Sequence, residues 1–294
     1  MYFAKKKLYH LIKKMLIFFL GTLFAPCLAV PGPVLSAPQG FAYAVDVDKA
    51  LPPSFFECVK RAGYSAVFTR AYDPTGAGRF DSNAVNNIRN AKKAGLETEV
   101  FMTPNVRSLK NGKKQFTELY RGLKKQKIEV KTVWLQVSSS MNWKNSTRAN
   151  IAFLKDILDK AKSYDVTIGF YTNAYAWSKI ANGAWVQNPL LWYCKVNGEG
   201  SSGETEANFS DFEPFGNFVE PRVKQFGKMV EVCGVTVNKN IYTLNQSMHF
   251  LAPSAEEHEL IQKFLRTRMG VPHVPTAFIL RERDGESVRD RSLW

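Results

Sequence analysis

The segment Lys131-Thr-Val-Trp-Leu-Gln-Val-Ser138 is a short apolar run, typical of a strand buried on both faces of a parallel sheet. Side chains alternate along a strand, so Trp134, Gln136 and Ser138 share one face. Neither Gln136 nor Ser138 can ionise near neutral pH, and neither can act as a general acid. The strand that indicates the fold therefore also restricts the chemistry at its carboxyl end.

Strand-like runs alternate with helical stretches through the first half of the chain. The expected strands are Phe41–Val47, Tyr64–Tyr72, Glu99–Thr103, Thr132–Ser138 and Thr167–Thr172. The expected helices, which show apolar residues at three- and four-residue spacing, are Pro53–Ala62, Asn83–Ala94, Lys113–Lys125 and Thr147–Ser163. This alternation predicts βαβ units and a parallel sheet.

The pattern changes after Leu190. Three more strands are expected at Leu190–Val196, Arg222–Phe226 and Val235–Ile241, with no helical period between them. The chain is therefore predicted to be an α/β protein, a TIM-like (β/α) barrel over residues 37–242 whose last three strands lack regular helices. An open doubly wound sheet is the alternative. Gly198-Glu-Gly-Ser-Ser-Gly203 matches the dinucleotide fingerprint, but no apolar helix follows it, so no such site is expected.

The two ends of the chain differ from the barrel. Residues 1–36 combine a lysine-rich head with an apolar run that Pro26 interrupts, which predicts a secretory signal cleaved between residues 29 and 36. An uncleaved anchor is the alternative, although the run is short for a stable membrane span. We expect a secreted protein, or one in the lumen of the secretory or lysosomal path. Residues 243–294 form a C-terminal extension of unknown role.

The chain is basic, with a formal net charge of +14. Residues 1–36 contain five lysines and no acid, so the remainder keeps 35 basic and 26 acidic residues and a charge of +9. Much of the excess lies between Lys110 and Lys131. One interpretation is a solvated helix face, and the other is attraction to a polyanion. For a secreted protein we expect that polyanion to be the bacterial wall and not nucleic acid.

Cysteine and histidine usage limits the chemistry further. Beyond residue 36 the cysteines are Cys58, Cys194 and Cys233, which predicts one disulfide and one free thiol without identifying the pair. Every histidine after residue 36 lies beyond Tyr242. This argues against Ser-His or Cys-His catalysis in the barrel and against a zinc cluster. No metal and no organic cofactor is expected.

Polar and aromatic residues recur where the expected strands end. In a parallel barrel these ends carry the functional groups. Aromatic rings stack on sugar faces, and amides bond to hydroxyl groups, so the set favours a carbohydrate site, although each aromatic taken alone is more simply explained as core. The expected substrate-binding residues are Tyr43, Arg70, Tyr72, Tyr171, Trp192, Gln225 and Asn238.

Several motifs together resemble the lysozymes of glycoside hydrolase family 25, most closely their secreted nematode and amoeba branch. The motifs are Tyr43-Ala-Val-Asp-Val47, Gly169-Phe-Tyr-Thr-Asn173, Leu191-Trp-Tyr193, Phe209-Ser-Asp-Phe-Glu-Pro-Phe-Gly216 and Val223-Lys-Gln-Phe226. The resemblance implies a TIM-like barrel and cleavage of bacterial peptidoglycan at its muramic-acid bond. It also implies a disulfide between Cys58 and Cys233, with Cys194 left free.

The same resemblance places the family's catalytic acids on this chain. Asp46 matches an acid at the end of the first strand. Gln136 and Ser138 stand where the family has an Asp-x-Glu pair, and Asn238 replaces a further acid. Since glycoside hydrolysis needs a proton donor and a second carboxylate or substrate group, three such changes predict a catalytically degenerate protein.

Three functions are consistent with this sequence. We expect a degenerate, lysozyme-like protein that binds the peptidoglycan of bacterial walls in innate defence. One alternative is an active muramidase that works through Asp46 and a substitute carboxylate or the substrate itself. Another is an interaction protein that no longer binds sugars. Glycosylation sequons occur at Asn145, Asn208 and Asn245. The oligomeric state is left open.

Overall fold

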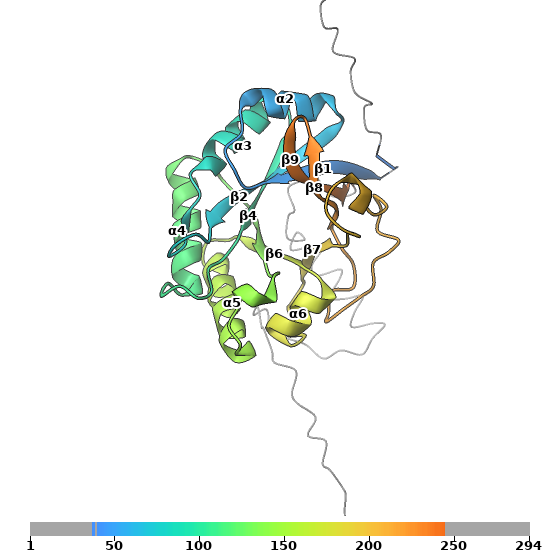
Figure 1. Ribbon diagram of the computed structural model, residues 1–294. Helices are drawn as coiled ribbons and strands as arrows, with labels where there is room; N and C mark the ends of the chain where they lie inside the picture. The colour runs from blue at the N-terminus through green and yellow to red at the C-terminus, as the bar shows by residue number, and fades with distance from the viewer. Residues whose placement is uncertain (1–36, 39, 245–294) are drawn as a thin grey trace, which may run out of the picture. The chain divides into compact units, whose positions relative to one another are not determined.

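The computed structural model describes residues 37, 38 and 40–244, and Figure 1 shows how their helices and strands are arranged. The strands are β1 Phe41–Val47, β2 Tyr64–Asp73, β3 Arg79–Phe80, β4 Glu97–Met102, β5 Thr132–Gln136, β6 Thr167–Thr172, β7 Leu190–Cys194, β8 Val223–Val232 and β9 Val235–Thr243. The helices are α2 Pro53–Arg61, α3 Asn83–Lys93, α4 Gly112–Lys125, α5 Thr147–Lys162 and α6 Ala174–Ala181, with short 3-10 turns η1 Ser140–Asn142 and η2 Ser201–Gly203.

Eight strands of the described chain close into a barrel. They follow the order β1-β9-β8-β7-β6-β5-β4-β2, and a parallel pairing between β1 and β2 closes the ring. The short strand β3 lies outside the ring, antiparallel to the end of β2. Closure confirms the predicted TIM-like α/β barrel and excludes the open doubly wound sheet.

The expectation of a barrel built from parallel strands was wrong for β9, which runs antiparallel to both β1 and β8. The chain reverses at Cys233 and Gly234, which have φ angles of 54° and 73°. Two residues with positive φ form the tight turn that suits a β-hairpin, whereas a parallel crossover needs a dozen residues or more. As a result the early part of β9, and not its end, lies beside the carboxyl end of β1.

The helices begin where short polar side chains cap them. Asn111, Ser146 and Asn173 accept hydrogen bonds from backbone N–H groups in the first turns of α4, α5 and α6. The sequence analysis missed α6, a short helix of eight residues after β6. No α-helix follows β7, β8 or β9 within the described residues, which confirms that the last three strands lack regular helices.

Large aromatic side chains fill the interior of the barrel. Trp134 and Trp192 are almost fully buried and meet edge to face with their ring centres 6.0 Å apart, and Phe68 packs 4.6 Å from Trp192. Gly169 of β6 makes room for Trp134, because a Cβ atom there would lie 2.4 Å from the indole ring. The filled interior leaves space for a ligand only towards the ends of the barrel.

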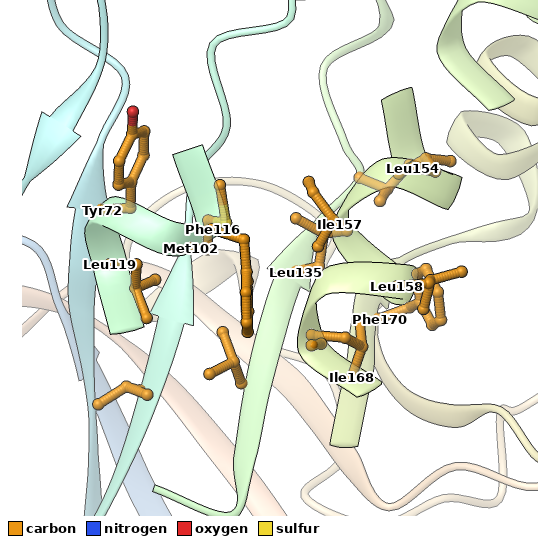
Figure 2. Close-up of a cluster of buried hydrophobic side chains, with 14 of the residues drawn as sticks. Tyr72, Met102, Phe116, Leu119, Leu135, Leu154, Ile157, Leu158, Ile168 and Phe170 are labelled. Carbon is orange, nitrogen blue, oxygen red and sulfur yellow. The ribbon is translucent and has the colours of Figure 1, made fainter. Parts of the chain in front are cut away.

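A second apolar layer lies between the barrel wall and the helices. Figure 2 shows its centre, where the α4 and α5 side chains Phe116 and Ile157 pack against the outward-facing residues Leu135 and Phe170 of the sheet. A smaller cluster, which includes Phe56, fills the space between α2 and the first strands. These two layers hold the strand ends in fixed positions.

A long loop takes the place of a helix between β7 and β8. It carries four phenylalanines that pack with the main apolar cluster: Phe209, Phe212, Phe215 and Phe218. A buried ion pair attaches the loop to the barrel, since Lys224 of β8 is fully buried and its Nζ lies 2.7 Å from Asp211 Oδ2. The Tyr193 hydroxyl also donates to Asp211 Oδ1 at 2.7 Å. The wall is therefore closed on this side without a helix.

Candidate functional site

The carboxyl ends of the parallel strands surround an opening with two adjacent hollows. The larger has a volume of about 320 Å³ and is lined by Pro74, Thr75, Thr103, Pro104, Asn105, Arg107, Gln136, Ser138, Ser139, Asn142 and Trp143. The smaller, of about 230 Å³, is lined by Asp46, Val47, Asp48, Lys49, Arg70, Phe101, Thr103, Gln136, Met229, Thr236, Val237 and Asn238. Thr103 and Gln136 line both hollows and separate them, so a single elongated ligand can extend across the two.

Asp46 lies in the smaller hollow, and two amides hold its carboxylate. Asn240 donates from Nδ2 to Asp46 Oδ1 at 2.7 Å, and Asn238 donates from Nδ2 to Asp46 Oδ2 at 2.8 Å. Each amide has its orientation fixed, because its Oδ1 accepts from a group that can only donate. These donors are the Trp192 indole for Asn240 and the Met229 backbone N–H for Asn238. Both asparagines therefore present N–H groups to Asp46.

The surroundings of Asp46 act on its pKa in opposite directions. Burial raises the pKa to about 6, the hydrogen bonds from Asn240 and Asn238 oppose this rise, and the nearby charge of Asp48 adds to it. Above this pH Asp46 is an ionised carboxylate. It can then accept hydrogen bonds from a ligand, but it has no proton to donate.

Gln136 and Ser138 occupy the carboxyl end of β5 and its continuation. The Thr103 hydroxyl donates to Gln136 Oε1 at 2.6 Å, which fixes the amide between the two hollows. The carbonyl oxygen of Ser138 accepts from the Trp143 indole at 3.0 Å, and Ser139 has a left-handed φ of 52°. Both side chains line the larger hollow. The expected pair of catalytic positions is thus at the opening, occupied by an amide and a hydroxyl.

Carboxylates are scarce at this opening. Within the described residues no Asp or Glu lines the larger hollow, and Asp46 and Asp48 line the smaller one. Asp48 is largely exposed, and its carboxylate pairs with Arg70 Nη1 at 3.3 Å. Arg70 in turn donates from Nε to Asp81 at 2.9 Å. The second carboxylate in the hollow is therefore already engaged by a cation.

Four further acids, all in the segment between β7 and β8, lie away from the opening. Glu204 bonds to Lys239, Asp211 to Lys224, and Glu199 to Lys228. Glu213 is exposed on the loop before β8 and lines neither hollow. None of these acids lies at the opening beside Asp46.

The structure divides the predicted substrate-binding residues into three groups. Arg70 and Asn238 line the smaller hollow. Tyr171, Trp192 and Gln225 lie below the opening, with the Tyr171 hydroxyl donating to Gln225 Oε1 at 3.0 Å. Trp192 and Gln225 are each only 2% exposed, so the prediction that they contact a ligand was wrong. They support the residues above them.

Tyr43 and Tyr72 do not face the opening, which corrects the prediction for both. Tyr43 projects from the outer face of β1 and packs against Tyr64 and Phe226, with ring centres 6.0 and 5.9 Å away. Tyr72 is fully buried, and its hydroxyl donates to Glu118 of α4 at 3.0 Å. A register shift in β2 between Arg70 and Tyr72 turns the tyrosine outward.

Loop residues contribute much of the larger hollow, and the sequence analysis did not identify them. Arg107 donates to the carbonyl oxygens of Met141 and Trp143 at 2.7 and 3.3 Å, which ties together the loops after β4 and β5. Asn105 and Asn142 add amide groups to the lining. In the sequence, only the length of the segment between β4 and α4 indicated a functional loop. Loop residues follow no periodic pattern from which the direction of their side chains could be predicted.

The cysteine pairing agrees with the expectation. Cys58 of α2 and Cys233 of the β8–β9 turn form a disulfide with their Cα atoms 6.0 Å apart, and Cys194 is free. Gln225 Nε2 lies 3.5 Å from the Cys194 sulfur, and burial raises the pKa of this thiol. Cys194 is therefore a neutral group beneath the opening and is poorly suited to act as a nucleophile.

The remaining predictions concern the glycosylation sequons, the two ends of the chain, and membrane or metal sites. Asn145 is exposed before α5, Asn208 is partly buried and accepts from Ser210, and Asn245 lies outside the described residues. The predicted signal, residues 1–36, and residues 245–294 also lie outside them. Within the described chain, no helix is long and apolar enough to cross a membrane, and no cluster of His, Cys, Asp and Glu could hold a metal ion.

The barrel is similar to solved structures of glycoside hydrolases. A family GH25 lysozyme from Aspergillus fumigatus has a TM-score of 0.53 at 14% identity, over 71% of this chain and 96% of that structure. A family 25 glycosyl hydrolase from Bacillus anthracis has a TM-score of 0.54 at 12% identity, over 74% of this chain and 95% of that one. These likenesses show the class of fold, which is a TIM-like α/β barrel.

Closer relatives are found by sequence. The family model for lysozyme-like protein 1 matches residues 37–226. Lysozyme-like protein 7 of Caenorhabditis elegans is 43% identical over 223 residues, which cover 74% of this chain and 78% of the relative. The probable GH family 25 lysozyme 5 of Dictyostelium discoideum is 31% identical over 203 residues, covering 67% and 89%. The chain belongs to the lysozyme-like proteins of glycoside hydrolase family 25, in the branch that these nematode and amoeba proteins represent.

Proposed function

We propose that this protein is a secreted, catalytically degenerate lysozyme-like protein that binds the glycan of bacterial cell walls and acts in innate defence. The observation that carries the proposal is the pair Gln136 and Ser138 at the carboxyl end of β5, where the family resemblance expects two acids. Both side chains line the opening, and neither can donate a proton at neutral pH.

The missing proton donor matters because of how glycosidic bonds break. One group must protonate the departing oxygen, and a second must stabilise the positive charge that develops on the sugar ring. A positioned general acid contributes on the order of a hundred- to ten-thousandfold to the rate. Asp46 can serve the second role, but its carboxylate is held in place by Asn238 and Asn240 and has no acid partner.

The same opening carries polar groups of the kind that bind sugars, which supports the proposal. Asn105, Asn142, Gln136 and Arg107 all line the larger hollow. A ligand site of this kind has a few fixed polar groups in a concave surface, as carbohydrate hydroxyl and acetamido groups require. Binding without turnover follows from keeping these groups while replacing the acids.

Secretion is supported by the disulfide and by the relatives. A disulfide between Cys58 and Cys233 is stable in an oxidising compartment and rare in the cytosol. Together with the signal expected in residues 1–36, it supports export of the chain.

The competing function is hydrolysis through Asp46 and Asp48, which line the same hollow. We consider it weaker, since Asp48 is largely exposed and paired with Arg70. A general acid must be held against the oxygen that it protonates, whereas the exposed Asp48 carboxylate is bonded to the Arg70 guanidinium.

The test measures wall binding and wall cleavage on the same preparation. Purified secreted chain is mixed with insoluble peptidoglycan, and both its retention on the pellet and the release of soluble fragments are recorded beside an active relative. We expect retention without release. Arg107→Ala with Asn142→Ala should reduce retention, while Arg148→Ala, an exposed arginine that lines neither hollow, should not. Fragment release at the rate of the active relative would overturn the proposal.

A further inference from the structure

The face of the barrel opposite the opening is strongly basic. Each α-helix of the described chain runs back from the opening, so its last turn lies next to the start of the following strand. Every one of these last turns carries Lys or Arg and every first turn lacks an acid. We define the basic face by Lys60, Arg61, Lys92, Lys93, Arg121, Lys124, Lys125 and Lys160, of which all but the half-buried Lys160 are exposed.

Helix-dipole stabilisation explains part of this pattern. A cation in the last turn of a helix is favourable by a few tenths of a kcal/mol up to about 1 kcal/mol, so one per helix needs no ligand. Here α2, α3, α4 and α5 each carry two. The exposed acids beside the strand starts are Glu97, Glu129, Asp165 and Glu220, too few to neutralise the face, and Glu220 is already paired with Arg222.

The ends of α4 and α5 form the most organised part of the basic face. These helices lie side by side (Figure 1), and Tyr120 stacks on Tyr164 with ring centres 4.1 Å apart and planes within 9°. Lys124 Nζ lies 5.8 Å from the centre of the Tyr120 ring, and Lys160 Nζ lies 4.5 Å from that of Tyr164. Each ring of the stacked pair thus has an ammonium group beside it.

Three cations at this place have no acid partner within the described residues. They are Arg121, Lys124 and Lys125, all of them exposed and none of them in an ion pair. By contrast, the first turn of α4 pairs its lysines, with Lys113 bonded to Asp156 and Lys114 to Glu118. Positive charge is therefore compensated near the opening and left uncompensated at the opposite end of the same helix.

We propose that the basic face binds a phosphodiester polymer attached to the bacterial wall, at a site separate from the opening. Repeated phosphates match a row of exposed cations, and binding of this kind depends on charge and not on a pocket. The aromatic pair fixes two of the cations, which reduces the side-chain freedom that binding must remove. A secreted protein with a wall-glycan site on one face and a polyanion site on the other attaches to the wall through two kinds of contact.

The test compares retention on walls that carry their phosphodiester polymers with retention on the same walls after those polymers are removed. The basic-face variant is Arg121→Gln, Lys124→Gln and Lys125→Gln. The matched control is Lys113→Gln, Lys114→Gln and Arg148→Gln, which removes the same charge from the first turns of α4 and α5. Both sets are exposed, so all variants should fold, and circular dichroism checks this.

We expect the wild type and the control to be retained more strongly on intact walls than on stripped walls, and the basic-face variant to lose most of this difference. Losing three phosphate contacts should reduce the slope of log affinity against log salt concentration by about 2, at roughly 0.7 for each contact. Equal retention of the wild type on both walls would overturn the proposal, as would an equal loss in variant and control.

Double-stranded DNA at the same phosphate concentration serves as a competitor. If DNA displaces the protein from intact walls at concentrations where the isolated wall polymer does not, the partner is nucleic acid and the assignment is wrong. Binding to stripped walls depends on the opening alone, so a failure of the glycan proposal is visible separately from a failure of this one.

Discussion

The buried ion pair between Lys224 and Asp211 gives the sharpest prediction about stability. Lys224 is fully buried and the Asp211 side chain is 21% exposed, with 2.7 Å between Nζ and Oδ2. Asp211→Asn leaves the ammonium group without its counter-ion, although Nζ keeps its bond to the Glu206 carbonyl oxygen at 2.7 Å. Removing one partner of a buried pair costs about 3–5 kcal/mol, and we expect about 3 kcal/mol here because Asp211 is partly exposed.

Two control variants isolate the effect of burial. The surface pair Lys155–Asp159 has the same 2.7 Å separation with side chains 53% and 39% exposed, so Asp159→Asn should cost less than about 1 kcal/mol. The double change Asp211→Asn with Lys224→Met removes both charges and should recover most of the loss, since a buried pair and an apolar substitute are often similar in stability.

The assay is urea denaturation at pH 7, followed by tryptophan fluorescence, with the free energy of unfolding extrapolated to water. Burial raises the pKa of Asp211, but the bonds from Lys224 and Tyr193 outweigh this and hold the pKa below its usual value. The stabilisation is therefore present above the pKa of an unfolded Asp and is lost as the pH falls through the folded pKa. If Asp211→Asn costs no more than Asp159→Asn, or the double change is as unstable as the single one, this reasoning is refuted.

Three further predictions concern the barrel and its opening. Burial raises the pKa of Glu99 to about 8, against the bond from the Trp134 indole, so wild-type stability should fall as the pH rises from 4.5 to 8, by about 4 kcal/mol. Glu99→Gln should flatten that dependence in denaturation at several pH values. The double change Cys58→Ala with Cys233→Ala removes a disulfide between residues 175 positions apart in the sequence. It should lower the unfolding free energy by about 3–5 kcal/mol, measured from the urea midpoint. Asn238→Asp replaces a donor 2.8 Å from Asp46 with a second carboxylate and should raise the pKa of Asp46 above about 6, as a carbon NMR titration would show; a fall would contradict the assigned contact.

The sequence predicted the barrel because periodicity depends on local spacing. The strands β1 and β6 and the starts of α2, α3 and α5 fall where expected. The direction of β9 was missed, since it is decided by the positive φ angles of Cys233 and Gly234 and not by the pattern of the strand itself. A residue pattern reports which face of a strand is apolar, but it does not report which way the strand runs.

The site was predictable only in part, for related reasons. Alternation along β1 puts Tyr43 and Asp46 on opposite faces, so Tyr43 could have been excluded from the sequence alone. The outward turn of Tyr72 results from an irregularity in β2 that alternation cannot reveal. Arg107 reaches the larger hollow through a loop, where no period applies.

The central claim is that the opening lacks the proton donor that hydrolysis requires. Release of reducing ends from purified peptidoglycan tests it most directly, with the wild type compared with the variant Gln136→Asp and Ser138→Glu. We predict no turnover above background for the wild type and a gain of about a hundredfold or more for the variant, the usual contribution of a positioned acid. Turnover by the wild type that Asp46→Asn abolishes, with no gain from the double change, would contradict the account.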